Sequence, residues 1–242
     1  KLAKEVGFDG IEANGPVSNR EEIKKASEAT GLPIHGVVCS THWGKPLSAA
    51  EQTQRDEGRA GLEGAMRDAH FYGADTVLLV PGVAKGKTSY EECWERSIAE
   101  IRKVLPLAEE LNLTIALENV WNDFLTDPKE NVRYIEEINS PRVKVYFDVG
   151  NAVRYSPPAE WISTLGNHII KLDVKGYTHP ENGQKLGSGF KAKIAHDDAD
   201  WPSVCAELKK IGYTGWATAE VGGGGKERLT EIYNNMEKAF SY

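Results

Sequence analysis

Residues 73–80 read GADTVLLV, a pattern in which a glycine and two short residues lead into an unbroken apolar run. The glycine is typical of a helix end, and the run is typical of a strand covered on both faces. Similar phrases lead into the residues that follow Gly7 and Gly212. A repeated helix–glycine–strand unit predicts parallel strands joined by helices, which is an α/β fold.

The same alternation runs along the whole chain. Strands are predicted at residues 8–13, 34–39, 75–80, 113–118, 143–148, 169–174 and 215–221. Helices are predicted at 18–30, 48–72, 89–111, 128–138, 158–165, 201–211 and 226–240, with Pro106 expected to kink or break the third. No shift in composition marks a boundary, so residues 1–242 are predicted to form a single domain. Both a doubly wound sheet and a (β/α)8 barrel fit, although GxGxxG and GxxxxGK[ST] are missing.

Composition excludes several classes of protein. The 242 residues are 40% hydrophobic and 27% charged, which is globular composition. A net charge of −7 argues against a nucleic-acid partner, and no run approaches the roughly 20 apolar residues that span a membrane. Cys39, Cys93 and Cys205 form no CxxC pair and are predicted to be buried free thiols. The predicted location is cytoplasmic, and a signal peptide ahead of Lys1 is left open.

Carboxylates end four consecutive predicted strands, at Glu118, Asp148, Asp173 and Glu220. In a parallel barrel these strand ends meet at one mouth, where chemistry is usually located. Crowded like charges are unfavourable unless a cation or proton compensates them, so a divalent metal held by all four is predicted. Oxygen ligands favour Mg²⁺ or Mn²⁺ over Zn²⁺. The competing interpretation is a set of helix caps and surface ion pairs.

Six phrases together resemble the sugar phosphate isomerase/epimerase superfamily of xylose isomerase-like barrels. They are GFDGIEA, GADTVLLVPG, IALENVW, YFDVGNAVRY, HIIKLDVKGY and GYTGWATAEV, and they cover almost the whole chain. The resemblance implies a (β/α)8 TIM barrel. Because seven strands are predicted and the chain starts KLAKEVG, like a helix tail, the first strand and the start of the first helix are expected to precede Lys1. A gap is then expected beside residues 8–13.

The resemblance implies metal ligation by Glu118, Asp148 and Glu220, with Mn or Mg as the leading candidates and Co or Zn as others. Most members carry a histidine where this chain has Asp173, which is still a competent oxygen ligand. Many members also have a histidine where this chain has Asn151, and residues 195–201 (AHDDADW) depart from the usual G-E-G-D-x-D-W phrase. These departures leave the identity of the metal and the reaction open.

The resemblance further implies an isomerase or epimerase of a ketose or sugar phosphate. Such an enzyme removes a proton next to a carbonyl and forms an enediolate that the metal stabilises. Glu118 and Glu220 are implied as the two residues that transfer protons. The candidate substrate-binding residues follow the strands, and they are His42, Trp43, Trp121, Asn122, Asn151, Lys175 and His196. Gly222–Gly225, ahead of Lys226 and Arg228, is either a phosphate site or a flexible turn.

Three other functions are kept as alternatives. A lyase or dehydratase acting on a 3-keto-glycoside would use the same metal and the same proton abstraction. Phosphodiester cleavage like that of endonuclease IV is disfavoured by only six histidines and the charge of −7. A sugar-binding barrel without catalysis is the third alternative. The predicted partner is a small sugar or sugar phosphate, and a homo-oligomer is left open.

Overall fold

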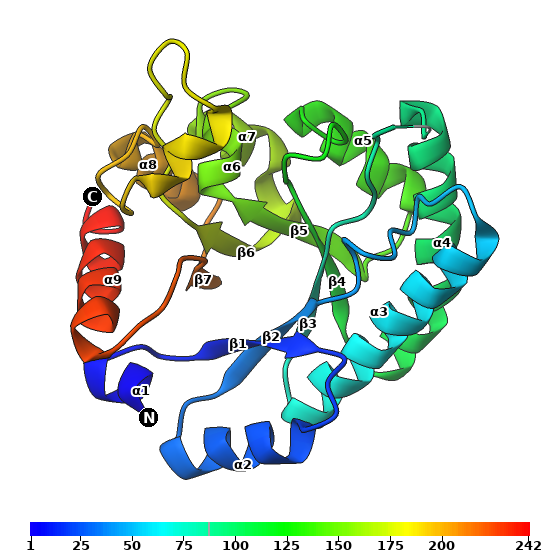
Figure 1. Cartoon of the computed structure of the whole chain (residues 1–242), viewed down its shortest axis with the longest axis horizontal. Helices are drawn as coiled ribbons and strands as arrows, with labels where there is room; N and C mark the ends of the chain where they lie inside the picture. The colour runs from blue at the N-terminus through cyan, green and yellow to red at the C-terminus, as the bar shows by residue number, and fades with distance from the viewer. Residues whose placement is uncertain (87) are drawn as a thin grey trace.

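Seven parallel strands stand next to one another in chain order, and helices surround them (Figure 1). The computed structural model describes residues 1–86 and 88–242. The strands are β1 (Ile11–Gly15), β2 (Ile34–Cys39), β3 (Thr76–Leu79), β4 (Thr114–Glu118), β5 (Val143–Asp148), β6 (Ile169–Val174) and β7 (Trp216–Ala219). This is a TIM barrel that is nearly closed, which confirms the predicted fold class.

Helices occupy the connections between the strands. They are α1 (Leu2–Val6), α2 (Arg20–Thr30), α3 (Gln52–Tyr72), α4 (Tyr90–Glu110), α5 (Pro128–Ile138), α6 (Val149–Val153), α7 (Pro158–Leu165), α8 (Trp201–Lys210) and α9 (Lys226–Ala239). Two 3-10 turns, η1 (Gly166–His168) and η2 (Leu186–Lys191), precede β6 and α8. No described helix has both the length and the hydropathy that a membrane crossing requires. The three cysteines are buried and free, as predicted.

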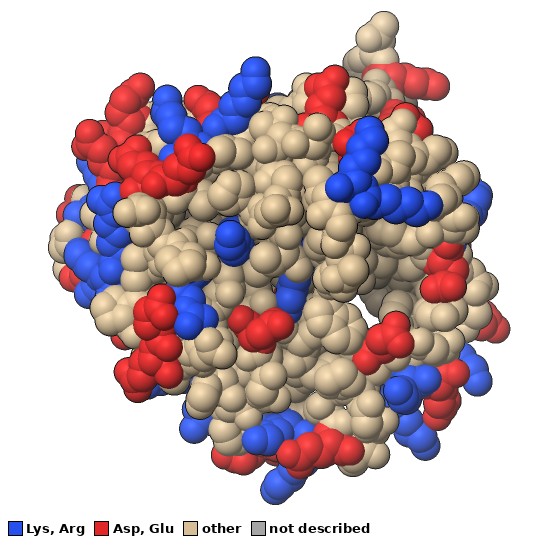
Figure 2. All heavy atoms as spheres, turned by 180° about the vertical axis from the view of Figure 1, so that it is seen from behind, with Lys and Arg blue, Asp and Glu red and all other residues tan. Residues whose placement is uncertain are grey.

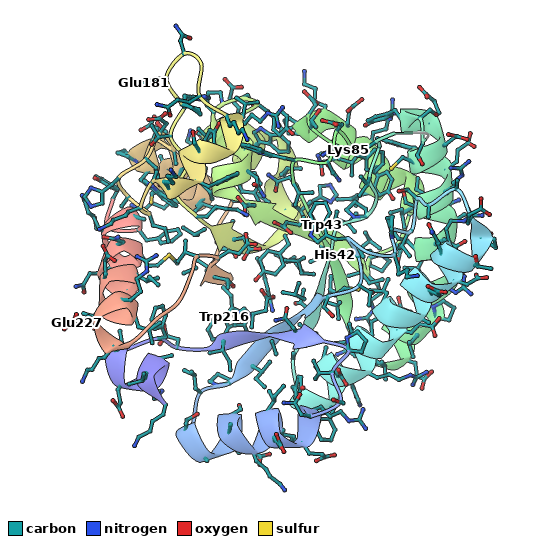
Figure 3. The ribbon with its side chains drawn as sticks, viewed as in Figure 1. His42, Trp43, Lys85, Glu181, Trp216 and Glu227 are labelled. Carbon is teal, nitrogen blue, oxygen red and sulfur yellow. The ribbon has the colours of Figure 1, made fainter. Side chains whose placement is uncertain are left out.

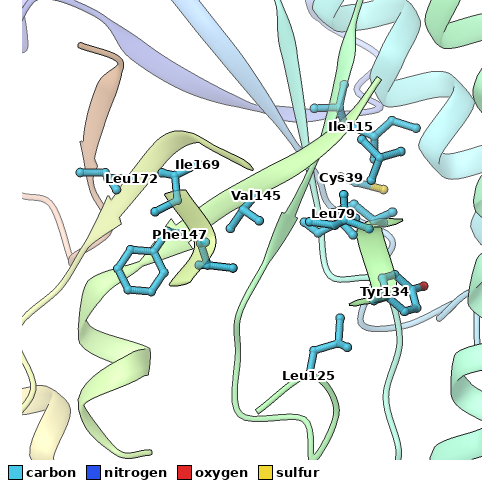
Figure 4. Packing of buried hydrophobic residues seen from close by; sticks show 14 of the residues in the cluster. Cys39, Leu79, Ile115, Leu125, Tyr134, Val145, Phe147, Ile169 and Leu172 are labelled. Carbon is cyan, nitrogen blue, oxygen red and sulfur yellow. The ribbon is translucent and has the colours of Figure 1, made fainter. Parts of the chain in front are cut away.

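Side chains alternate along each strand between two places. One set packs between the strands and the helices, and the other points into the barrel. Val145 and Phe147 of β5 point outward and join the main hydrophobic core beneath the helices (Figure 4). The residue between them, Tyr146, belongs to a small inner cluster with Leu78 and Ala116. Because the period is two residues, Glu118 follows Ala116 onto the inner face and Asp148 follows Tyr146. The strand pattern therefore delivers carboxylates to the inside of the barrel mouth.

The barrel has an opening between β7 and β1. Within the described ranges the sheet order begins at β1 and ends at β7, and these two strands do not pair. A cavity of about 450 Å³ lies there, lined by residues of β1, β7 and α9, and a hollow is visible from behind (Figure 2). Trp216 lies between the two strands (Figure 3) and stacks on His35 of β2 with ring centroids 4.5 Å apart. The gap expected beside residues 8–13 is present.

Two predictions about elements were wrong in detail. The first strand begins at Ile11 rather than at Phe8, because Phe8 packs edge-on against Tyr233 of α9 with ring centroids 5.5 Å apart. The helix α4 also continues through Pro106, so of the expected kink or break the break does not occur. Pro106 is exposed, so water can satisfy the carbonyl that the missing N–H leaves unpaired.

Candidate metal centre

The four predicted carboxylates come together at the mouth of the barrel. One oxygen from each of Glu118, Asp148, Asp173 and Glu220 lies within 4.8 Å of the others. Glu118, Asp148 and Asp173 are buried at the ends of β4, β5 and β6, whereas the Glu220 side chain is 51% exposed. The backbone N–H of Glu220 donates to the carbonyl of Val174 at 3.0 Å, which extends the β6–β7 pairing by one residue.

Asparagine side chains hold the backbone around this cluster. The Asn119 amide donates to the Asp148 carbonyl at 2.9 Å and accepts from the Asp148 N–H at 2.8 Å. Asp148 then caps α6 by accepting from the Asn151 N–H at 2.6 Å. The Asn151 amide donates to the Asn119 carbonyl at 2.9 Å and to Glu118 Oε1 at 3.4 Å. The positions of Glu118 and Asp148 are therefore set by hydrogen bonds at the ends of two adjacent strands.

The chemistry of these groups fits a divalent cation. Asp173 Oδ1 is buried without a hydrogen-bond partner in the part of the chain that the structure describes. Asp148 Oδ2 is also buried, and it contacts the ammonium group of Lys175 at 3.0 Å. Burial, reinforced by neighbouring carboxylates, raises the pKa values of Glu118 and Asp173 well above their usual range. Burial also raises the pKa of Asp148 to about 7. Buried carboxylates that repel one another, one of them with an oxygen that lacks a hydrogen-bond partner, suit a hard cation such as Mn²⁺ or Mg²⁺.

Lys175 already places one positive charge in this cluster. Its Nζ lies 3.0 Å from Asp148 Oδ2, and it also forms an ion pair with Glu220. The lysine side chain is only 17% exposed. Burial would lower the pKa of the ammonium group, but Asp148, Glu118 and Glu220 outweigh this effect and raise it. Lys175 is therefore a partly buried cation among carboxylates.

A cavity of about 800 Å³ opens beside the carboxylates. Of the predicted substrate-binding residues, it is lined by His42, Trp43, Trp121, Asn151 and Lys175. His42 and Trp43 pack edge to face with ring centroids 5.6 Å apart, and Figure 3 shows them together near the middle of the barrel. His42 Nδ1 accepts from the Val80 N–H at 3.2 Å, which leaves Nε2 as its N–H donor.

Two predicted substrate-binding residues lie outside the wall of this cavity. Asn122 is buried, and its amide donates to the Gly82 carbonyl at 2.6 Å and accepts from the Phe124 N–H at 3.2 Å, so it holds a loop. His196 is exposed on the segment before α8, with Nε2 at 3.4 Å from Lys238 Nζ. Nothing in this geometry brings either side chain toward the carboxylates.

The cavity wall also contains residues that the sequence did not single out as substrate-binding. They are Glu12, Asn14, Ser40, Phe190, Lys191 and Lys193, together with apolar neighbours. Gly222 and Arg228, from the segment interpreted as either a phosphate site or a flexible turn, line the same cavity. Asn14 and Ser40 stand near the ends of β1 and β2, so strand-end position was the signal that could have found them. Phe190, Lys191 and Lys193 lie on a long loop, and no pattern in that loop indicated contact with the mouth.

The fold and this mouth define a TIM-barrel protein with a candidate metal centre. Residues 1–238 match the family described as xylose isomerase-like TIM barrel, and the chain belongs to that family. The resemblance predicted from the sequence is therefore confirmed.

Similar proteins include an uncharacterized protein of Methanocaldococcus jannaschii, which is 25% identical over 66% of this chain and 55% of its own length. A Haemophilus influenzae protein, provisionally named L-ribulose-5-phosphate 3-epimerase, is 24% identical over 88% of this chain and 79% of its own length. The solved structure of an L-ribulose 3-epimerase superposes with a TM-score of 0.81. It is 14% identical, covers 99% of this chain and 86% of its own, and shows the shared fold.

Proposed function

We propose that this protein is a metal-dependent isomerase or epimerase of a ketose or ketose phosphate. It would remove and return a proton on a carbon next to a carbonyl. The Haemophilus influenzae relative that is provisionally named a sugar phosphate epimerase supports this proposal. The carboxylate cluster beside a cavity large enough for a sugar supports it as well. The finer assignment, to epimerisation rather than isomerisation, rests on the arrangement of two of the carboxylates.

The observation that carries the proposal is that Glu118 and Glu220 stand at the two ends of the cluster. Asp148 and Asp173 belong to β5 and β6, which lie between β4 and β7 in the sheet. A substrate held at the middle of this arc would have one glutamate on each side. Epimerisation needs such a pair, because one group removes the proton from one face and another returns it to the opposite face.

A divalent ion held by Glu118, Asp148, Asp173 and Glu220 would bind the oxygens of the substrate and stabilise negative charge that develops on them. Around it, the chain supplies orientation. The Nε2–H of His42 and the ring of Trp43 face the cavity and can hold a sugar hydroxyl and its apolar face. Trp121, whose ring packs on Phe190 with centroids 4.5 Å apart, gives the cavity a second aromatic wall.

Cationic side chains at the rim favour a phosphorylated ketose. Lys191, Lys193 and Arg228 line the same cavity. Lys193 and Arg228 both form ion pairs with Glu231. The three cations and this one carboxylate together carry a net charge of +2. A phosphate group there would meet charged donors that a free ketose could not use.

The test is proton exchange in D₂O with Mn²⁺ present. Ketopentoses and ketohexoses are supplied with and without a terminal phosphate, and deuterium at each carbon is followed by NMR. We expect deuterium at the inverted stereocentre and a higher kcat/KM for the phosphate esters. Glu118→Gln and Glu220→Gln should each lower turnover by about 10²-fold or more.

The metal content of both variants is measured in parallel, because a glutamine that loses the ion would lose activity for a different reason. Near-normal turnover in either variant would remove that glutamate from the mechanism. Release of a leaving group from a 3-keto-glycoside, without inversion, would support the lyase alternative instead.

A further inference from the structure

The partly buried ammonium of Lys175 contacts carboxylate oxygens that a metal bound in this cluster would also need. Its Nζ is 3.0 Å from Asp148 Oδ2 and is paired with Glu220, and both residues belong to the four-carboxylate set. Lys171, which is fully buried, lies 3.3 Å from His35 Nδ1 and 2.7 Å from Asp75 Oδ1, and neither residue belongs to this set. Lys175 is thus the lysine that neutralises the cluster from within.

We propose that Lys175 is a built-in counter-ion that competes with the divalent metal and limits its affinity. It compensates the carboxylates when the metal is absent, and the entering ion displaces it from Asp148 and Glu220. The released ammonium faces the cavity, where it can bind an anionic oxygen of the substrate. This inference rests on the metal site of the proposed function.

Local packing fixes the position of the Lys175 side chain when no metal is bound. Gly150, at the start of α6, leaves the space that the lysine uses. A Cβ at Gly150 would lie 2.6 Å from Lys175 Cγ and 2.4 Å from the Lys175 carbonyl oxygen. The ammonium also lies 5.6 Å from the centroid of the Phe190 ring, on the side of the cavity. The ammonium group therefore lies between the carboxylates and the Phe190 wall of the cavity, and the cavity offers it space to move into.

The direct test is Mn²⁺ binding to the metal-stripped protein, measured by isothermal titration calorimetry. A charge within about 4–6 Å commonly changes an ionic equilibrium by one to three powers of ten. We therefore expect Lys175→Met to bind Mn²⁺ at least about 10-fold more tightly. Lys191→Met, which removes a lysine from the cavity wall outside the carboxylate set, is the matched control and should bind like the wild type.

Thermal unfolding gives a second readout that does not depend on turnover. Lys175→Met without metal should unfold at a lower temperature than the wild type, and Mn²⁺ should raise its Tm by more. Lys175→Gln serves if the methionine variant does not fold. In Lys175→Ala, added propylammonium should weaken Mn²⁺ binding again, while the wild type is unaffected.

Equal or weaker Mn²⁺ binding by the folded Lys175 variants would overturn this inference and leave the metal site of the proposed function intact. If neither the wild type nor any variant binds Mn²⁺, the metal site and this inference fail together.

Discussion

At the scale of single residues, Asn119 decides where Asp148 stands. Its side-chain amide accepts from the Asp148 N–H at 2.8 Å and donates to the Asp148 carbonyl at 2.9 Å, and both residues are buried. Asn119→Ala leaves those groups unpaired, which costs about 1–3 kcal/mol of unfolding free energy. Groups that orient metal ligands are typically worth about 10- to 100-fold in affinity, so Mn²⁺ binding should weaken by that amount.

Urea unfolding and Mn²⁺ titration together measure both effects. Asn234→Ala, on the exposed face of α9, is the control and should change stability by less than about 0.5 kcal/mol. If the stability of Asn119→Ala falls while its metal affinity stays that of the wild type, Asn119 supports the fold and does not orient the ligand.

The contrast between Asp148 and Asn119 shows which parts of the candidate site could be predicted from the sequence. The four carboxylates could be predicted, because each ends a strand and parallel strands bring their ends together. The clamp by Asn119 could not, because its amide reaches across from one strand to the backbone of the next. Asn122 and His196 were predicted from their loops, and a loop position does not say which way a side chain turns.

At the scale of elements, the strands were the most predictable part. β2, β5 and β6 match the predicted ranges residue for residue, since both of their faces are covered and each is a short, mostly apolar run. The short helix α6 was not predicted. Its five residues have too little periodicity, and the cap that starts it is the Asp148 carboxylate, which was interpreted as a metal ligand.

Helix α3 packs closely against the loop that contains His42, and the contact is made at Gly58. A Cβ at Gly58 would lie 2.2 Å from the carbonyl oxygen of Lys45, which is backbone and cannot rotate away. Gly58→Ala should therefore cost about 1–3 kcal/mol through overpacking, although alanine favours a helix by about 1 kcal/mol over glycine. The shift of the loop should also weaken substrate binding.

Thermal unfolding and KM check the two parts of this prediction. Gly187→Ala is the control, because its Cβ would meet nothing within 4 Å and its backbone is not left-handed. A Gly58→Ala protein that is as stable as the wild type would show that α3 can move away from the loop.

At the scale of the whole molecule, buried histidines and buried carboxyl groups have opposite effects on how stability depends on pH. Burial lowers the pKa values of His35 and His42 to about 4, and it raises that of Glu12 to about 7. The histidines therefore stabilise the fold above pH 6.5 and lose that contribution as the pH falls toward 4. Glu12 does the reverse, since its contribution is lost as the pH rises through about 7. The net pH dependence of stability is a balance between these groups.

A single substitution isolates the contribution of His42 to the pH dependence of stability. Protonating His42 at Nδ1 would break its hydrogen bond with the Val80 N–H, and Asn at this position cannot be protonated. We expect His42→Asn to lose less stability than the wild type between pH 7 and pH 5, by about 1–2 kcal/mol, measured by urea unfolding at both pH values. Ser40→Ala in the same loop removes no titrating group and should follow the wild type. Parallel loss of stability in the wild type and His42→Asn would mean that His42 binds its proton equally well in the folded and unfolded chain, and that the loss comes from other groups with lowered pKa values, such as His35.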